Sequence, residues 1–297
     1  MSTVGVCAWS LRPEGPRDLC DKLAAAGLSA VQLALDPLRT GQWSETETVA
    51  TLSSARITIL SGMMATAGED YSTLDTIRQT GGLRPDRTWH ENLAAATANA
   101  ELAHRLRIPL ITLHAGFLPH HPADPLRATM LDRLRQVAAA FAANGIQLAL
   151  ETGQESAPLL LDYLTELNSP GRSALRTDPS SPGTPALRAD IGVNFDPANM
   201  LLYGTGDPID ALRLLSPHIL QVHIKDARRT TTPGQWGTET PAGRGEVPWP
   251  AFFAALRAIP RPVNLLIERE SGDTRLEDIR AARRLIETHA TPTGAPR

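Results

Sequence analysis

The chain has 297 residues, of which 42% are hydrophobic, 21% charged and 4% aromatic, and its formal net charge is −3. This apolar fraction excludes an intrinsically disordered chain, and the negative charge argues against a dedicated nucleic-acid binder. The two cysteines, Cys7 and Cys20, exclude a disulfide scaffold and indicate a reducing compartment. The apolar runs are too short to cross a membrane and the N-terminus does not read as a signal peptide, so we expect a soluble, cytoplasmic protein.

Short apolar runs recur along the chain, as is typical of strands that are buried on both faces of a parallel sheet. We expect eight such strands, at Val4–Leu11, Ala30–Leu35, Ile57–Leu60, Leu110–Leu113, Gln147–Leu150, Gly192–Phe195, Ile219–Ile224 and Val263–Ile267. The segments between them have helical spacing and composition. We expect helices at Arg17–Ala26, Ser44–Ala55, Thr88–Arg107, Asp124–Ala143, Ser156–Leu167, Asp207–Leu215, Trp249–Ala258 and Thr274–Ile286.

The alternation of strands and helices predicts an α/β fold, because parallel strands need helical crossovers. Eight units favour a closed (β/α)8 TIM barrel, and the first strand is not followed by the G-x-G-x-x-G pattern of a dinucleotide-binding fold. The helix at Thr88–Arg107 opens with a Thr-x-x-Glu pattern, which predicts a capping box. We expect one domain over residues 1–297, with long loops at about 64–87, 168–190 and 230–245.

Active sites of TIM barrels lie at the C-terminal ends of the strands. Four successive expected strands end in side chains that can bind a metal, 45, 27 and 45 residues apart: Glu151, Asp196, His223 and Glu268. Any one carboxylate could instead cap a helix or pair with a cation, but four in succession favour convergence at the barrel mouth. Three carboxylates and an imidazole suit Mn(II) or Mg(II), and without a cation they would repel one another.

Five sequence segments resemble the sugar phosphate isomerase/epimerase superfamily, whose barrels look like xylose isomerase. They are Glu151–Glu155, Asn194–Asn199, Val222–Asp226, Gly243–Trp249 and Ile267–Glu270. The resemblance covers nearly the whole chain. In related ketose 3-epimerases a Glu, an Asp, a His and a Glu at these strand ends bind one divalent metal. The resemblance thus implies one ion, with Mn favoured over Mg, Co or Zn, held by Glu151, Asp196, His223 and Glu268.

The resemblance also implies a reaction on a small-molecule sugar or sugar phosphate. The metal would act as a Lewis acid, while Glu151 and Glu268 on opposite faces of the substrate remove and return a proton through an enediolate. Epimerisation and aldose–ketose isomerisation are both open. The alternatives are a polyol-ketone dehydratase of the same superfamily and a non-catalytic sugar-sensing barrel. An apurinic-endonuclease branch shares the barrel, but it binds a trinuclear zinc cluster with several more His ligands. The negative net charge of this chain also argues against DNA binding.

Three further residues are candidates for substrate binding. His114 ends the fourth expected strand and either faces the substrate or is a hydrogen-bonded barrel histidine. Lys225 follows His223 by two residues and so points the same way along a strand. It could hold a substrate oxygen or pair with a carboxylate at a strand end. It is notable because 27 of the 29 basic residues are arginine. Trp9, at the first strand, either forms an apolar wall or packs in the core.

Comparison with related epimerases adds two candidates. Arg229 lies where they place a substrate-binding arginine, although Arg228 could substitute or both could be solvated. Asn199 stands where many of them have the His of Asp-x-x-His, and an amide can bind a hydroxyl but cannot transfer a proton. Glu155 could bind an Arg or the substrate, or favour a helix N-terminus. We expect no nucleic-acid or membrane partner, and leave the oligomeric state, including a homo-oligomer, open.

Overall fold

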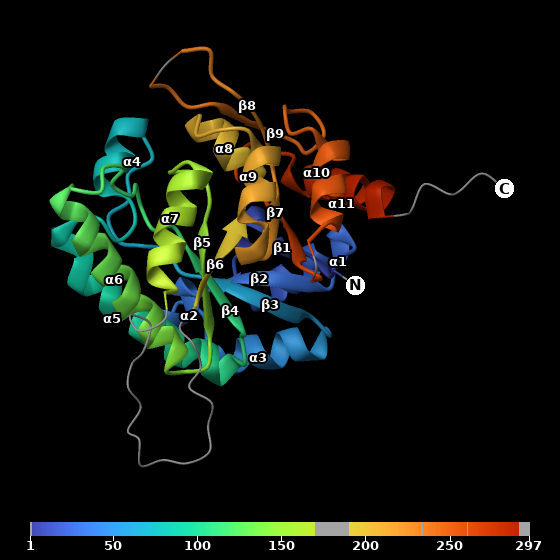
Figure 1. Cartoon of the computed structure of the whole chain (residues 1–297). Coiled ribbons are helices and arrows are strands. Elements are labelled where there is room, and N and C mark those ends of the chain that lie inside the picture. Colours follow the sequence, from blue (N-terminus) through green and yellow to red (C-terminus); the bar gives the residue numbers. More distant parts are fainter. Residues whose placement is uncertain (1, 170–189, 233, 260, 291–297) are drawn as a thin grey trace.

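Eight parallel strands close into a barrel in the order β1-β10-β7-β6-β5-β4-β3-β2, which confirms the predicted TIM barrel (Figure 1). The computed structural model describes residues 2–169, 190–232, 234–259 and 261–290. The barrel strands are β1 (Val4–Cys7), β2 (Ala30–Ala34), β3 (Thr58–Met63), β4 (Leu110–Leu113), β5 (Gln147–Glu151), β6 (Ile191–Phe195), β7 (Ile219–Ile224) and β10 (Asn264–Ile267). Each is short, and all except β3, which is only partly buried, are almost wholly buried, as the apolar runs predict.

Helices form the outer layer of the barrel (Figure 1). They are α1 (Pro16–Ala26), α2 (Asp36–Arg39), α3 (Glu45–Ser54), α4 (Leu74–Thr80), α5 (Asp86–Leu106), α6 (Pro125–Ala142), α7 (Ala157–Leu167), α8 (Pro197–Tyr203), α9 (Pro208–Leu215), α10 (Trp249–Arg257) and α11 (Arg275–Ala290). Their ends follow local chemistry. Asp124 caps α6 by accepting the Leu126 N–H, and Gly27 ends α1 at φ 70°, in the left-handed region that glycine favours.

Three local expectations were wrong. The first strand stops at Cys7, and Ala8–Leu11 form a 3-10 helix (η1) instead of continuing it. The third strand runs from Thr58 to Met63, beyond the expected end at Leu60. Thr88 does not begin a helix with a capping box, because α5 already starts after the N-cap Pro85, and Thr88 bonds back to the Pro85 carbonyl within the first turn.

The expected long loops contain secondary structure. The 64–87 segment holds α4 and the start of α5, and the 230–245 segment holds β9 (Thr238–Thr240). β9 pairs antiparallel with β8 (Asp226–Arg228), forming a hairpin directly after β7. Figure 1 shows α4, α8 and this hairpin at the end of the barrel toward which the parallel strands run. Nearly all of the 168–190 loop lies outside the described residues.

Polar side chains occupy part of the barrel interior. Five residues from five strands have no exposed surface and hydrogen-bond to one another, and we call them the polar layer: Gln32, Ser61, Thr112, Asn194 and Gln221. Around the barrel, between strands and helices, the core is apolar. No described helix is both long and apolar enough to cross a membrane.

Candidate metal centre

The four predicted metal ligands come from neighbouring strands and meet at one point. Glu151 is the last residue of β5, His223 is the fifth residue of β7, and Glu268 directly follows β10. Asp196 follows β6 and is the N-cap of α8. One ligand atom from each lies within 4.8 Å of the other three. The order β10-β7-β6-β5 in the barrel explains why residues so distant in sequence converge.

The imidazole of His223 is central to this group. Its Nδ1 lies 3.3 Å from an oxygen of Glu268, 3.4 Å from one of Glu151 and 3.7 Å from one of Asp196. None of the four residues is more than 5% exposed. Three carboxylates in so small and dry a space repel one another unless a cation lies between them.

Buried atoms without a hydrogen bond are also consistent with a cation site. Within the described residues, neither Asp196 Oδ2 nor His223 Nδ1 makes a hydrogen bond. The other oxygen of Asp196, Oδ1, is fully used, because it accepts the N–H groups of Ala198 and Asn199 at the start of α8. Buried polar atoms are almost always paired, so these residues fit a divalent ion bound by hard oxygen ligands and one imidazole.

The ionisation of the group is strongly perturbed. Burial raises the pKa of Asp196 to about 6, although Lys225 and His223 act in the opposite direction. Burial also lowers the pKa of His223, but Cys7, Glu268 and Glu151 outweigh it and hold that pKa well above its usual range. A divalent ion bound here would take these groups in their deprotonated forms, so its binding would compete with protons.

Lys225 extends the cluster toward solvent. Its Nζ lies 2.9 Å from Glu268 Oε2 and 2.5 Å from Glu270 Oε2, and 3.4 Å from Asn199 Oδ1. Burial opposes its charge, but Glu268, Glu270 and Asp196 outweigh this and hold the pKa of Lys225 well above its usual range. It therefore shares the side of the strand that His223 occupies, as the two-residue period predicts, and it pairs with carboxylates.

The two carboxylates at the outer strands of the cluster are held by different partners. Glu151 accepts hydrogen bonds from Asn199 at 3.0 Å and Asn194 at 3.3 Å, and His114 Nε2 lies 3.8 Å away. Glu268 Oε1 accepts a 2.8 Å bond from the indole N–H of Trp9. The polar edge of Trp9 thus holds a predicted metal ligand, a contact that neither an apolar wall nor core packing predicts.

A cavity of about 350 Å³ opens above the cluster. It is lined by Tyr71, His114, Asn199, Leu202, Tyr203, Lys225, Trp236, Gly237, Glu239, Glu270 and Ser271. The rings of Tyr203 and Trp236 pack edge to face, with their centroids 4.8 Å apart. The rings of Tyr71 and Trp236 are stacked, with their centroids 6.5 Å apart. Three of the predicted substrate-binding residues, His114, Asn199 and Lys225, thus line the cavity, and the sequence did not predict its aromatic wall.

Arg229 is not brought to this cavity. Its side chain is 45% exposed and its Nε lies 3.9 Å from Glu246. Arg228 is also exposed, and it donates to the Arg244 carbonyl. Glu155 is 4% exposed and lies just before the N-cap of α7, where burial raises its pKa to about 8.

Two acidic residues that organise the mouth were also missed. Asp226, 1% exposed, accepts five hydrogen bonds, and four of them hold the segment 243–249 against the β8–β9 hairpin. Glu239 on β9 pairs with Arg269 and accepts the N–H groups of Glu270 and Ser271. The hairpin is thereby tied to the loop that carries Glu270. Asp226 was within a noted motif, but its partners lie about 20 residues further along the chain.

Comparison with known proteins places the chain in a family. The sequence profile described as xylose isomerase-like TIM barrel matches residues 20–175 and 183–289. The chain belongs to this family. A 63-residue stretch is also 44% identical to the uncharacterized protein YihM of Escherichia coli K12, but it covers 21% of this chain and 19% of YihM. The match thus spans about a fifth of that curated relative.

Solved structures of the family superpose over almost the whole chain. A xylose isomerase domain protein from Planctomyces limnophilus is 28% identical, with a TM-score of 0.79 and 91% of each chain covered. D-allulose 3-epimerase from Methylomonas sp., in complex with D-allulose, is 16% identical, with a TM-score of 0.69 and 97% of each chain covered. A Mycobacterium smegmatis protein of the family, in complex with magnesium, is 14% identical, with a TM-score of 0.68 and 98% of each chain covered.

Proposed function

We propose that the protein is a divalent-metal-dependent isomerase or epimerase that acts on a sugar by proton transfer through an enediolate. The observation that carries the proposal is the convergence of Glu151, Asp196, His223 and Glu268, with buried ligand atoms that lack hydrogen bonds. The cluster lies at the end of the barrel where TIM-barrel enzymes have their active sites. Relatives of similar fold that are named as sugar epimerases support the same class of substrate.

The four residues would hold one ion, with Mn(II) favoured, and the ion would supply Lewis acidity at a substrate carbonyl. Glu151 and Glu268 would then exchange protons with the carbon next to that carbonyl, one accepting and the other donating. Side-chain donors hold both carboxylates: Asn199 and Asn194 donate to Glu151, and Trp9 donates to Glu268. These bonds support the orientation that a carboxylate needs for proton transfer to carbon.

Lys225, Asn199 and His114 line the cavity and would bind substrate oxygens. The ammonium group of Lys225 lies next to Glu268. Its positive charge would stabilise negative charge that develops on a nearby substrate oxygen. Asn199 supplies an amide that can bind a hydroxyl but cannot carry a proton. The proposal therefore assigns proton transfer to the two glutamates and binding to these three side chains.

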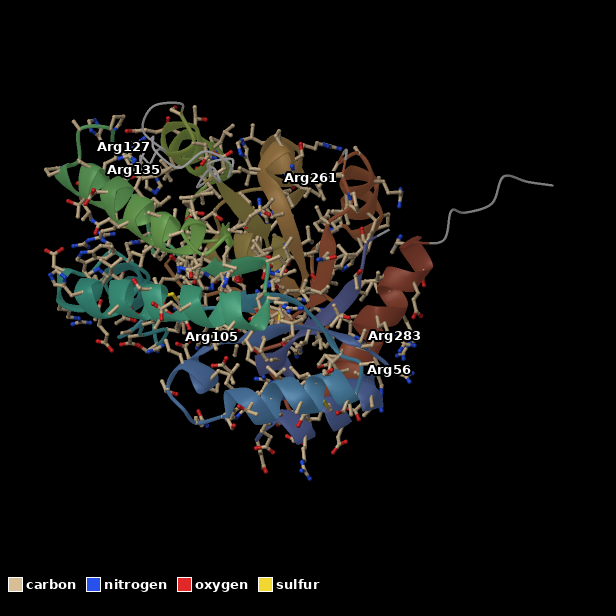
Figure 2. All side chains as sticks on the ribbon, turned by 90° about the horizontal axis from the view of Figure 1, so that it is seen from below. Arg56, Arg105, Arg127, Arg135, Arg261 and Arg283 are labelled. Atoms are coloured by element: carbon tan, nitrogen blue, oxygen red, sulfur yellow. The ribbon has the colours of Figure 1, made fainter. Side chains whose placement is uncertain are left out.

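The charges around the cavity favour an unphosphorylated sugar. Phosphate sites normally use arginine, lysine or a helix N-terminus. Among the described residues that line the cavity, Lys225 is the one lysine or arginine, and it already lies between Glu268 and Glu270. Six arginines labelled in Figure 2 lie instead on outer helices or on the connections between strands and helices: Arg56, Arg105, Arg127, Arg135, Arg261 and Arg283.

The test is a panel of free ketoses and ketose phosphates, incubated with Mn(II) and the protein in deuterated water. We expect deuterium on the carbon next to the carbonyl of a free ketose. Glu151→Gln and Glu268→Gln should abolish this exchange while the fold is kept, and Glu101→Gln, an exposed change on α5, should leave it intact. Exchange at the wild-type rate in both site variants would contradict the mechanism.

The same panel, extended with a cyclic polyol ketone and with a direct measurement of sugar binding, separates the alternatives. Loss of water from a cyclic polyol ketone would identify a dehydratase, which needs the same metal and base. Binding of a sugar with no exchange and no product would identify a sensing barrel. Faster exchange with phosphorylated ketoses than with free ones would overturn the preference for an unphosphorylated substrate.

A further inference from the structure

The ring of His223 has a second nitrogen, and it faces away from the metal cluster into the polar layer. While Nδ1 points to the three carboxylates, Nε2 lies 2.8 Å from Gln32 Oε1 and 3.0 Å from Asn194 Nδ2. One of these neighbours is a hydrogen-bond acceptor and the other is a donor. A single ring nitrogen satisfies the acceptor when it carries a proton and the donor when it does not.

Only one of these states suits a metal ligand. A neutral imidazole carries one proton, so Nδ1 is free to bind a metal only when Nε2 is protonated. Protonated Nε2 donates to Gln32, whereas bare Nε2 accepts from Asn194 and leaves a proton on Nδ1. Gln32 and Asn194 therefore favour opposite tautomers, and Gln32 favours the one that binds metal. The thiol of Cys7 also lies 3.6 Å from Nε2, but a thiol is a weak donor and a weak acceptor.

The orientation of the Gln32 amide is set by its other contacts. Its Nε2 donates to Thr112 Oγ1 at 2.7 Å, and that hydroxyl in turn donates to the sulfur of Met63 at 2.9 Å. The Thr112 oxygen is then free to accept, so the Gln32 carbonyl oxygen is directed at His223. The thiol of Cys7 lies 3.4 Å from the same oxygen. Gln32 has no exposed surface, and water does not compete for these contacts.

The strand pairing is also irregular next to the polar layer. The β2–β3 register shifts just before Gln32, so that Gln32 pairs with Ser61. The β6–β7 register shifts just before Asn194, which then pairs with Gln221. All four of these residues belong to the polar layer. Irregular pairing next to a site commonly re-aims side chains, and here it brings amides to the base of the cluster.

We propose that Gln32 is a positioning residue that holds His223 in the tautomer with Nδ1 free, and so raises the affinity of the cluster for a divalent ion. The proposal rests on the metal site of the proposed function. Hydrogen-bond partners of metal-bound histidines typically change metal affinity by about 10–100-fold when removed. Gln32 is outside the cluster itself and does not line the cavity.

The experiment is a calorimetric titration of Mn(II) into metal-free protein. Gln32→Leu removes the acceptor and should weaken binding by about 10–100-fold. Gln32→Glu keeps an acceptor and should bind within about threefold of wild type or more tightly. Gln221→Leu is the matched control, since it removes a buried amide of the polar layer that bonds to Ser61 and Asn194 but not to His223.

A second readout reports the tautomer directly. In the Mg(II)-loaded wild-type protein, ¹⁵N NMR of the His223 ring should show the proton on Nε2. A proton on Nδ1 overturns the proposal, as does Mn(II) binding by Gln32→Leu within about threefold of wild type, or an equal loss in Gln221→Leu. If Gln32→Leu does not fold, Gln32→Glu and the NMR spectrum decide. A wild-type chain that binds no Mn(II) overturns both this inference and the metal site, whereas binding without sugar turnover overturns the proposed reaction alone.

Discussion

Replacing the Asp226 carboxylate by an amide is a small chemical change that should destabilise the protein strongly. Its Oδ1 accepts the N–H groups of Ala227 and Val247, and its Oδ2 accepts those of Gly243 and Gly245 and the indole N–H of Trp249. In Asp226→Asn the new NH2 group faces two or three of these donors, whichever way the amide turns. Each buried donor left unpaired costs about 1–3 kcal/mol, so we expect a loss of about 2–9 kcal/mol.

Urea unfolding of wild type and Asp226→Asn, followed by tryptophan fluorescence, measures this difference. A loss of this size is a large part of a typical free energy of unfolding of about 5–15 kcal/mol. Asp210→Asn is the control, because its side chain is 80% exposed and should change stability by no more than about 0.5 kcal/mol. A loss below about 1 kcal/mol in Asp226→Asn would refute the reasoning that the bonds to Asp226 organise the segment after the hairpin.

Three other substitutions test single contacts. Lys225→Arg keeps the charge but does not fit the ammonium position between Glu268 and Glu270, so kcat should fall at least about tenfold; an unchanged kcat would refute this. Trp9→Phe removes the donor to Glu268 and should lower kcat about tenfold, while the free energy of unfolding measured in urea changes by no more than about 1 kcal/mol. A kcat equal to that of wild type would count against the role of this bond. Burial raises the pKa of Glu155 from 4.5 to about 8, so the wild-type protein should lose stability as the pH rises through this window. Glu155→Gln should have a free energy of unfolding up to about 4 kcal/mol above that of wild type at pH 8, and the same as wild type near pH 4. Parallel pH profiles of the two proteins in urea unfolding would contradict this.

The barrel was predictable because buried parallel strands leave a strong trace in sequence. Each strand is a short apolar run between helical segments, and the closed order follows from eight such repeats. The convergence of Glu151, Asp196, His223 and Glu268 was predictable for the same reason, since strand ends are defined by where the apolar runs stop. The functions assigned to these residues stay predictions.

Features that depend on long-range side-chain geometry were not predictable. Trp9 was placed at a strand exit, but the bond to Glu268 depends on a 3-10 turn after Cys7 that apolar patterning does not distinguish from a longer strand. Arg229 follows a strand that bends into an antiparallel hairpin, so its direction could not be read from a parallel repeat. A signal for Gln32 was present, because a lone amide within an apolar run marks a polar contact inside the barrel.

The central claim is that four side chains at the barrel mouth hold one divalent ion. Crystals grown with Mn(II), measured at a wavelength where manganese scatters anomalously, test it most directly. We predict one anomalous peak per chain, within coordination distance of Glu151, Asp196, His223 and Glu268, and its loss in Asp196→Ala. The absence of a peak there, or several zinc peaks in the protein as purified, would contradict the account.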